Sequence, residues 1–359
     1  MRPGLVGPGR SAYKTKFVLQ IIIQPELRAC QALSREQMFL HNRIGGNVMR
    51  RLVSISLFLL FASLASGSLL AAQPLVDGDW IEGNLGKSNV VILDIRNKID
   101  KGSREVYETG HIPAAIYSNY LEDGWRAKKD GVVAMLPDMA DLEQLIGGLG
   151  IGNDDHVVIV PGGVSAADYG SATRVYWTFK VIGHDEVSIL NGGYALWSSQ
   201  KRAVETGSNR REPKAFKAHY RPELVASRDD VAGVVKTGTG AVLVDNRPPV
   251  QYMGEKKSGK AARFGAIPGA RNIPQGQFYD ESGHAFTNLQ KLGEMWQQAG
   301  IADGAEQITY CNTGHWASLG WFASSELLGN KRTRMYDGSI ADWSLRKELP
   351  MVNTNTKNN

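Results

Sequence analysis

The sequence predicts an α/β fold made of two copies of one domain, each a mostly parallel sheet flanked by helices on both faces. Two observations predict it: segments recur at a nearly constant offset, and strand-like runs alternate with helix-like runs. The offsets lie between 146 and 155 residues, which indicates a duplicated domain of about 130 residues. The matching pairs are VVILDIR (90–96) with AVLVDNR (241–247), GHIPAAIYSNY (110–120) with GAIPGARNIPQ (265–275), HVVIVPGG (156–163) with QITYCNTG (307–314), and LNGGYALW (190–197) with YDGSIADW (336–343).

Each copy is expected to present its elements in the same order. A β-branched run ends in Asp-x-Arg, and a Gly-x-Ile-Pro-x-Ala turn leads to a short strand. A helix-like stretch follows, over 139–151 in the first copy and 288–301 in the second. A buried strand then leads to a second helix, expected over 172–183 and 316–329, and to a last short strand. This alternation favours a parallel sheet that is covered on both faces.

The N-terminal region has the pattern of a secretory signal. Met49 precedes two arginines and an apolar run, and small residues follow with cleavage expected after Gly67 or Ala72. An uncleaved membrane anchor is the alternative. A periplasmic or secreted protein that meets the membrane only transiently is therefore expected. The expected divisions are an upstream extension (1–48), the signal peptide (49–72), a first domain (74–200), a charge-rich linker (201–222), a second domain (223–350) and a tail (351–359).

Composition excludes several classes of protein. The 359 residues are 42% hydrophobic and 21% charged, an ordinary globular mixture with a net charge of +5. The first 72 residues hold 9 of the 41 basic and 2 of the 36 acidic residues, so no basic stripe for nucleic acid remains. Histidine and cysteine show no metal-ligand spacing, and no glycine-rich nucleotide loop is present. No cofactor is therefore expected.

Cys311 is the residue that carries the chemistry. The only other cysteine, Cys30, lies before Met49, so an exported chain would keep one thiol and no internal disulfide. The run EQITY (306–310) would place Cys311 at the carboxyl edge of the sheet, just before a helix. A glycine-containing loop there points backbone N–H groups inward, which predicts an anion cradle and a lowered thiol pKa. A small buried hydrophobic role is the alternative. The first copy has Val160 or Pro161 at this place, which predicts one catalytic copy and one inactive copy.

In these motifs the chain resembles the tandem-domain rhodanese family, the thiosulfate and 3-mercaptopyruvate sulfurtransferases. The resemblance covers roughly residues 74–350 and implies sulfur transfer through a Cys311 persulfide to a thiophilic acceptor such as cyanide or a thiol. It implies a small anionic sulfur donor, no cofactor and a monomer with its site between the domains. The motifs are Asp245-Asn-Arg247, Gly265-Ala-Ile-Pro-Gly-Ala270, Tyr310-Cys311, Asp337-Gly-Ser339 with Trp343, Asp94-Ile-Arg96, Gly110-His-Ile-Pro113 and Arg174-Val-Tyr-Trp177.

The resemblance also assigns roles to individual residues. Arg174 of the inactive copy would reach across the domain interface to bind the donor, and a local surface ion pair is the alternative. Asp245 and Arg247 would brace the loop, and His111 would line the pocket or hold a turn. The cradle itself would be lined by Asn312, Thr313, Gly314, His315 and Trp316.

The loop departs from both branches of the family. Thiosulfate enzymes usually carry cationic residues after the cysteine, and mercaptopyruvate enzymes carry Gly, Ser and Thr, whereas this loop reads CNTGHW. His315 would supply a partial positive charge near its ordinary pKa of about 6.5, or would only donate a hydrogen bond. The donor stays open between thiosulfate and 3-mercaptopyruvate, and predicted export favours the inorganic donor.

Two rival functions are weighed against sulfur transfer. A cysteine-dependent phosphatase needs an arginine at the end of its loop, but Ala317 stands at the sixth position after Cys311 and no arginine follows before Arg332. A non-turnover persulfide carrier for a protein partner is the other rival. Trp316 and Trp321 would form its contact patch, although aromatic residues at helical spacing are more often core.

Overall fold

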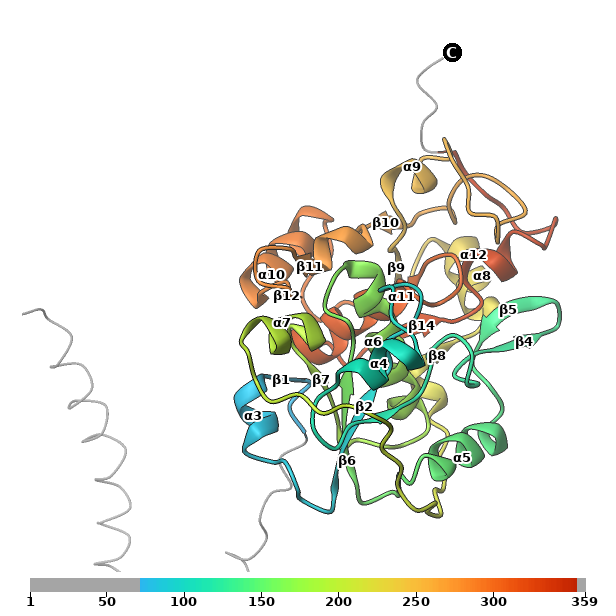
Figure 1. Cartoon of the computed structure of the whole chain (residues 1–359). Coiled ribbons are helices and arrows are strands. Elements are labelled where there is room, and N and C mark those ends of the chain that lie inside the picture. Colours follow the sequence, from blue (N-terminus) through green and yellow to red (C-terminus); the bar gives the residue numbers. More distant parts are fainter. Residues whose placement is uncertain (1–71, 354–359) are drawn as a thin grey trace, which may run out of the picture. The chain divides into compact units, whose positions relative to one another are not determined.

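The computed structural model of the protein describes residues 72–353 (Figure 1). The predicted upstream extension, nearly all of the predicted signal peptide and most of the tail lie outside the described residues. Within the described part, no helix has both the length and the apolar character needed to cross a membrane. Two α/β units follow one another along this part of the chain.

The first unit contains a five-stranded sheet in which all neighbouring strands are parallel, as predicted. The strand order is β1-β7-β6-β2-β3. The connections between these strands run through helices on both faces, which is the way parallel strands are joined. The strands are β1 (Leu75–Val76), β2 (Val90–Asp94), β3 (Ile116–Tyr117), β6 (His156–Val160) and β7 (Val187–Leu190).

Alternating side chains of the strands bury two different cores. In β2, Val91 and Leu93 enter one core, whereas Ile92 enters the other. The first core is covered by α5 and α6, through residues such as Leu142 and Val175, and the second by α3, α4 and α7. The helices are α3 (Gly78–Glu82), α4 (Arg104–Thr109), α5 (Met139–Gly148), α6 (Ala166–Val181) and α7 (Gly193–Ser199).

The second unit repeats the first strand by strand. Its strands are also all parallel, in the order β10-β9-β13-β14-β8. Read from the opposite edge, β8-β14-β13-β9-β10, this is the order of the first sheet with each strand replaced by its counterpart. The strands are β8 (Val225–Ala226), β9 (Val242–Asp245), β10 (Arg271–Asn272), β13 (Gln307–Tyr310) and β14 (Thr333–Tyr336). The helices are η1 (Pro222–Leu224), α8 (Arg228–Thr237), α9 (Pro249–Tyr252), η2 (Gln275–Phe278), α10 (Leu289–Gln298), α11 (Ala317–Trp321), η3 (Phe322–Leu327) and α12 (Ser339–Trp343).

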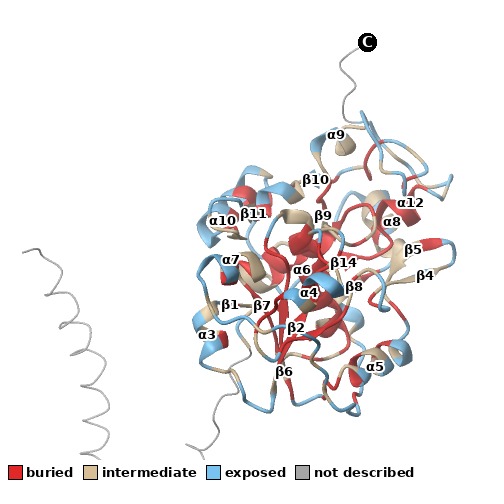
Figure 2. Cartoon of the chain, in the orientation of Figure 1, coloured by how far each residue is buried: buried red, intermediate tan, exposed pale blue. Residues whose placement is uncertain are grey.

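The two units share one hydrophobic core where α6 and α11 meet (Figure 2). α6 is buried on nearly all sides, because the first sheet lies on one side and the second unit on the other. It begins at Ala166, six residues before the expected start, because the Ser165 hydroxyl caps it by accepting from the N–H of Asp168. The helix expected over 316–329 is α11 continued by the π-helical turns of η3.

Two small hairpins and the linker complete the fold. The first hairpin is β4 (Ala127–Lys129) with β5 (Val132–Met135), and the second is β11 (Tyr279–Asp280) with β12 (Ala285–Phe286). The linker is tied to the first unit by charge: the Lys214 ammonium lies 2.7 Å from a carboxylate oxygen of Asp155. Its charged residues therefore fix the path of the chain between the two units.

Candidate active site

Cys311 lies at the carboxyl end of a central strand of the second sheet. β13 ends at Tyr310 between β9 and β14, at the edge where open α/β sheets bind ligands. The loop that follows leads into α11. Cys311 is only 1% exposed and is the one cysteine within the described range 72–353. The strand therefore brings the thiol to the expected edge of the sheet, but other residues of the same chain cover the thiol.

The first turn of α12 holds the Cys311 loop in place through hydrogen bonds. The Ser339 hydroxyl accepts hydrogen bonds from the N–H groups of Cys311 (3.1 Å) and Gly314 (3.2 Å). The N–H of Ile340 donates to the carbonyl of Cys311 at 3.1 Å. Ser339 also donates to a strand carbonyl at the end of β14, so the loop geometry is set by the sheet and α12 together.

Three backbone N–H groups, from Thr313, Trp316 and Ala317, hydrogen-bond the Cys311 sulfur. These bonds lower the pKa of the thiol, as the cradle predicts, but burial raises it by more. The pKa of Cys311 therefore lies above its ordinary value. The expectation of a lowered pKa is wrong, because desolvation of a nearly covered sulfur outweighs the three hydrogen bonds.

Arg174 brings a guanidinium from the first unit to the loop. It lies on α6, is fully buried, and its Nη1 lies 2.5 Å from Oδ1 of Asp337 at the end of β14. The other oxygen of Asp337 accepts from the N–H of Leu136 at 2.6 Å. Gly314 has a φ of 74°, and a side chain there would collide with this guanidinium. The alternative of a local surface ion pair is wrong, since Arg174 is buried and pairs across the two units.

His315 is held neutral between the two units. Its Nε2 lies 2.7 Å from the carbonyl of Ala167, and its Nδ1 lies 2.9 Å from the Tyr120 hydroxyl. The carbonyl can only accept, so Nε2 carries the proton and Nδ1 accepts from Tyr120. Burial, together with the charge of Arg126, lowers the pKa of His315 to about 3. The expected partial positive charge on His315 is therefore wrong, and the hydrogen-bonding alternative describes the structure.

The remaining loop residues take different positions. The Asn312 amide donates to the side-chain oxygen of Gln251 at 2.9 Å. Thr313 is half-buried and lines a hollow between the units. Trp316 is half-buried against the shared core, and Trp321 is fully buried in it. Trp321 is therefore a core residue and cannot belong to an exposed contact patch.

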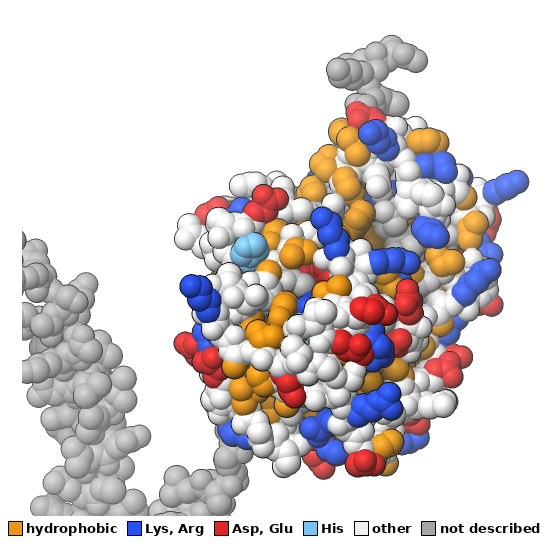
Figure 3. All heavy atoms as spheres, in the orientation of Figure 1, with side chains coloured by type: hydrophobic (Ala, Val, Ile, Leu, Met, Phe, Trp, Pro, Cys, Tyr) orange, Lys and Arg blue, Asp and Glu red, His pale blue; other side chains and the backbone are white. Residues whose placement is uncertain are grey.

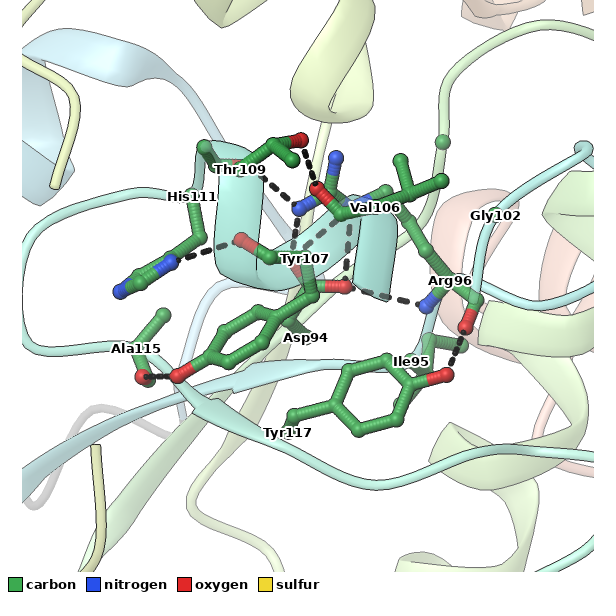
Figure 4. Close-up of polar contacts among 12 residues, drawn as sticks. Asp94, Ile95, Arg96, Gly102, Val106, Tyr107, Thr109, His111, Ala115 and Tyr117 are labelled. Atoms are coloured by element: carbon green, nitrogen blue, oxygen red, sulfur yellow. Dashed lines mark hydrogen bonds and ion pairs between the residues drawn. The ribbon is translucent and has the colours of Figure 1, made fainter. Parts of the chain in front are cut away.

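Asp245 and Arg247 form a buried brace behind the loop. The Arg247 guanidinium donates to the Asp245 carboxylate and, at 3.0 Å, to the carbonyl of Gly265. The first unit repeats this arrangement with Asp94 and Arg96 (Figure 4). In both units the pair ties the end of a central strand to the Gly-x-Ile-Pro turn.

His111 belongs to that turn in the first unit. Its ring stacks on Tyr107 with 4.0 Å between centroids, and its Nδ1 lies 2.9 Å from the Tyr107 carbonyl (Figure 4). Asn209 of the linker contacts its other nitrogen at 3.1 Å. Of the two roles considered for His111, the structure shows that of a turn residue.

The first unit keeps the cradle but fills it with its own carboxylate. The side chain of Asp168 accepts from the N–H groups of Gly162 (3.1 Å), Gly163 (2.5 Å) and Val164 (3.1 Å). By the offset of 151 residues Gly162 corresponds to Thr313, which is one of the three donors to the Cys311 sulfur, whereas Gly163 and Val164 correspond to Gly314 and His315. Asp168 also hydrogen-bonds Asp100, and burial raises the pKa of both carboxyls. The cradle of the first unit therefore already holds an anion-like group.

Sequence reasoning missed Tyr120 and Arg126. Both residues lie in the segment just before β4. The β4–β5 hairpin was not predicted, although Asp130-Gly131 is a strong hairpin-turn signal. Both turn residues have positive φ, 49° and 82°.

Among residues 72–353, no group of three or more His, Cys, Asp or Glu side chains is placed to hold a metal ion.

Comparisons with known proteins agree on one family. A family model of the rhodanese-like domain matches residues 77–200 and 228–346. The sulfur carrier protein TtuD of Thermus thermophilus is 33% identical over 296 residues, covering 78% of this chain and 96% of that protein. A Saccharopolyspora erythraea protein, provisionally named a thiosulfate sulfurtransferase, is 31% identical over 291 residues, covering 78% and 96%. SseA of Escherichia coli, a 3-mercaptopyruvate sulfotransferase, matches in structure with a TM-score of 0.65 at 24% identity, covering 75% of this chain and 99% of that one.

Proposed function

The chain belongs to the family of proteins with rhodanese-like domains, and we propose that it is a sulfurtransferase whose nucleophile is Cys311. The observation that carries this proposal is a single thiol ringed by backbone N–H groups at the edge of the second sheet. The corresponding loop of the first unit has no thiol, and Asp168 fills its cradle. We therefore assign the reaction to the second unit alone.

In the first half-reaction, the Cys311 thiolate attacks the outer sulfur of an anionic donor. With thiosulfate, a bond forms between this sulfur and Sγ, the donor S–S bond breaks, and sulfite leaves with the electron pair. The product is a Cys311 persulfide with an anionic terminal sulfur. The N–H groups of Thr313, Trp316 and Ala317, which bond Sγ, support this step because hydrogen bonds at the sulfur would stabilise negative charge on the persulfide.

In the second half-reaction, an acceptor nucleophile attacks the terminal sulfur of the persulfide. The bond from that sulfur to Sγ breaks, and its electron pair returns to Cys311. With cyanide the product is thiocyanate, and with a thiol it is a new persulfide. Both half-reactions balance without an external oxidant or reductant.

Positive charge for the donor comes from the first unit. The loop after Cys311 adds none, because His315 is neutral. Arg174 lies beside Gly314, and its Nε is buried without a hydrogen-bond partner among the described residues. A guanidinium can bind a sulfonate or a carboxylate in a bidentate manner, and at Arg174 such an anion would take the place of the Asp337 carboxylate on Nη1. We favour thiosulfate over 3-mercaptopyruvate, because we also propose export through the signal starting at Met49.

A persulfide carrier for a protein partner is the second candidate function. It is supported by the name of the relative TtuD, a sulfur carrier protein. Against it stands the 1% exposure of Cys311, since a folded partner has no direct access to so covered a sulfur. Small acceptors that enter between the two units fit this burial better.

The test is an intact-mass measurement of the purified protein before and after incubation with thiosulfate. We expect a gain of one sulfur atom that cyanide removes, with release of thiocyanate. The Cys311→Ser variant should gain none, which also excludes labelling at Cys30.

Three other outcomes change the proposal. A gain with 3-mercaptopyruvate but not with thiosulfate would move the protein to the other donor class. A stable gain that neither cyanide nor small thiols remove would favour the carrier function. No gain from either donor would contradict sulfur transfer from small molecules.

A further inference from the structure

A hollow between the two units opens beside the Cys311 loop. Its volume is about 250 Å³, several times the roughly 30 Å³ that one water molecule occupies in the liquid. Thr313 forms part of its wall, and the N–H of Thr313 hydrogen-bonds the Cys311 sulfur. We call this hollow the basic pocket. It is lined by Leu121, Arg126, Ala127, Lys128, Val133, Ala134, Lys260 and Thr313.

Three cationic side chains line the basic pocket, and no carboxylate does. Arg126 and Lys128 come from the β4–β5 region of the first unit, and Lys260 comes from the second. Within residues 72–353, none of the three makes an ion pair, although the neighbouring Lys129 lies 2.7 Å from an oxygen of Asp138. Figure 3 shows several Lys and Arg side chains on the face where Figure 1 places this hairpin. The charges of the pocket are therefore uncompensated by protein.

Arg126 is the lining residue whose hydrogen-bond donors are least used by the protein. Its guanidinium lies over the Tyr120 ring, 4.7 Å from the centroid, and its Nε is buried without a hydrogen-bond partner among the described residues. Its two terminal nitrogens are accessible to solvent and make no hydrogen bond or ion pair within residues 72–353, so they are available to an acceptor group in the pocket. A carboxylate is a suitable partner for a guanidinium with free donors.

The size and the charge of the pocket point to the acceptor rather than to the donor. The donor anion is assigned to Arg174, which does not line the basic pocket and contacts its wall only through the carbonyl of Ala134, at 3.3 Å. Cyanide is diatomic and carries one charge, so it needs neither this volume nor three cations. A larger molecule with several negative charges satisfies both, provided that it also carries the nucleophile.

We propose that the basic pocket binds the sulfur acceptor, a low-molecular-mass thiol that carries two or more carboxylates. Its carboxylates lie among Arg126, Lys128 and Lys260, and its thiolate faces the Cys311 persulfide past Thr313. The acceptor sulfur bonds to the terminal sulfur, the bond to Sγ breaks, and the electron pair returns to Cys311. This inference names the acceptor class and rests on the proposed sulfurtransferase function.

The kinetic test uses protein loaded with thiosulfate and freed of excess donor. Mercaptosuccinate is the dicarboxylate acceptor, and 2-mercaptoethanol is the neutral one; intact mass follows loss of the persulfide sulfur. We expect Lys128→Gln and Lys260→Gln each to slow transfer to mercaptosuccinate by about tenfold, and transfer to 2-mercaptoethanol by much less. Lys129→Gln is the matched control, because this lysine lies on the same hairpin but pairs with Asp138. It should behave like the unchanged protein.

A binding measurement separates this inference from the function on which it rests. Binding of (methylthio)succinate, which has no free thiol, is followed by ligand-observed NMR with unloaded protein. We expect binding that Lys260→Gln weakens, and that weakens when salt rises from about 0.01 M to about 1 M. Lys129→Gln should bind as the unchanged protein does. This binding would persist even if no donor ever loaded Cys311.

Two results would overturn the proposal. One is an equal loss of rate with both thiols in the Lys128 and Lys260 variants, or none with mercaptosuccinate, together with absent binding of (methylthio)succinate. The other is a slowing of persulfide formation from thiosulfate as large as the slowing of transfer to mercaptosuccinate. In that case the basic pocket serves the donor.

Discussion

At Cys311, burial and hydrogen bonding act on the thiol in opposite directions. The three N–H groups favour the thiolate, and removal of water disfavours it by more. The same N–H groups would act on a persulfide, which loses its proton more readily than a thiol does. The cradle is therefore suited to hold the loaded intermediate rather than to keep the free cysteine ionised.

This balance predicts how persulfide formation depends on pH. Because the pKa of Cys311 is raised, the thiolate fraction at neutral pH is small, and it rises about tenfold per pH unit until the pKa is reached. The single-turnover rate of loading by thiosulfate, followed by intact mass, should rise throughout pH 6 to 8.5, as reference values place an ordinary thiol near about 8.5. A rate that levels off below about pH 7.5 would show instead that the N–H groups outweigh burial.

Charge at the site is divided between residues far apart in the sequence. His315 contributes hydrogen bonds only, since it is neutral between Tyr120 and Ala167. Of the cations near the loop, Arg174, Arg126 and Lys128 belong to the first unit and Lys260 to the second. Under the proposed function, the first unit would therefore supply most of the positive charge for a reaction at a sulfur of the second.

At the scale of elements, a hairpin of each unit lies beside a loop of the other: β4–β5 beside the Cys311 loop, and β11–β12 beside the Gly163 loop. The β4–β5 hairpin borders the Cys311 loop, where the carbonyl of Ala134 accepts from Arg174 at 3.3 Å. In the other direction, Tyr279 of β11 donates to the carbonyl of Gly163 at 3.1 Å, and His284 lies 3.2 Å from the same oxygen. Each of the two corresponding loops therefore lies beside a hairpin of the other unit; one loop carries the Cys311 thiol, and the N–H groups of the other bind the Asp168 carboxylate of the following helix.

The elements that were predictable have strong local patterns. The strands that end at Asp94 and Asp245 are short β-branched runs, and the repeat revealed that the elements follow the same order along the chain in both units. The hairpins lack such runs and depend on turn chemistry, as at Asp130-Gly131. The pKa of Cys311 was mispredicted and the charge of His315 stayed open between two alternatives, because burial depends on tertiary contacts that no local pattern encodes.

The loop of the first unit predicts a pH dependence of stability. Burial, and after it the charge of Asp168, raise the pKa of Asp100 from 3.8 to about 7. The folded protein therefore holds a proton that the unfolded chain releases. This contribution to stability is complete below pH 3.8 and is lost as pH rises through about 7. Asp100→Asn keeps a hydrogen-bond donor toward Asp168 but cannot titrate.

Urea unfolding at pH 5 and pH 8.5 measures this effect. The midpoint of the unchanged protein should fall between these two pH values by more than that of Asp100→Asn. Parallel falls in both proteins would show that Asp100 and Asp168 do not share a proton in the folded state.

At the scale of the whole molecule, the two units form one structure around α6 and α11. The His315 ring of the second unit packs against Gly170 of α6. A Cβ on Gly170 would lie 2.7 Å from Nε2 of His315. That ring is held by Ala167 on one side and Tyr120 on the other. The close approach of α6 to the Cys311 loop therefore depends on a residue without a side chain.

Two glycine substitutions test this dependence against helix propensity. In α8, Gly233 is exposed, and an added Cβ there meets no atom within 4 Å. Gly233→Ala should stabilise the protein by about 0.5–1 kcal/mol, because alanine restricts the unfolded chain. Gly170→Ala has the same propensity gain, but overpacking against His315 should cost about 1–3 kcal/mol. Urea midpoints should therefore rise for Gly233→Ala and fall for Gly170→Ala.

The rate of persulfide formation adds a readout that stability alone does not provide. Displacing His315 moves the loop that carries Cys311, so Gly170→Ala should load sulfur more slowly even at urea concentrations where it is fully folded. Gly233→Ala should load at the rate of the unchanged protein. If Gly170→Ala instead gained stability and kept its loading rate, the two units would not be packed as closely as one site requires, and Arg174 could not reach the Cys311 loop as described.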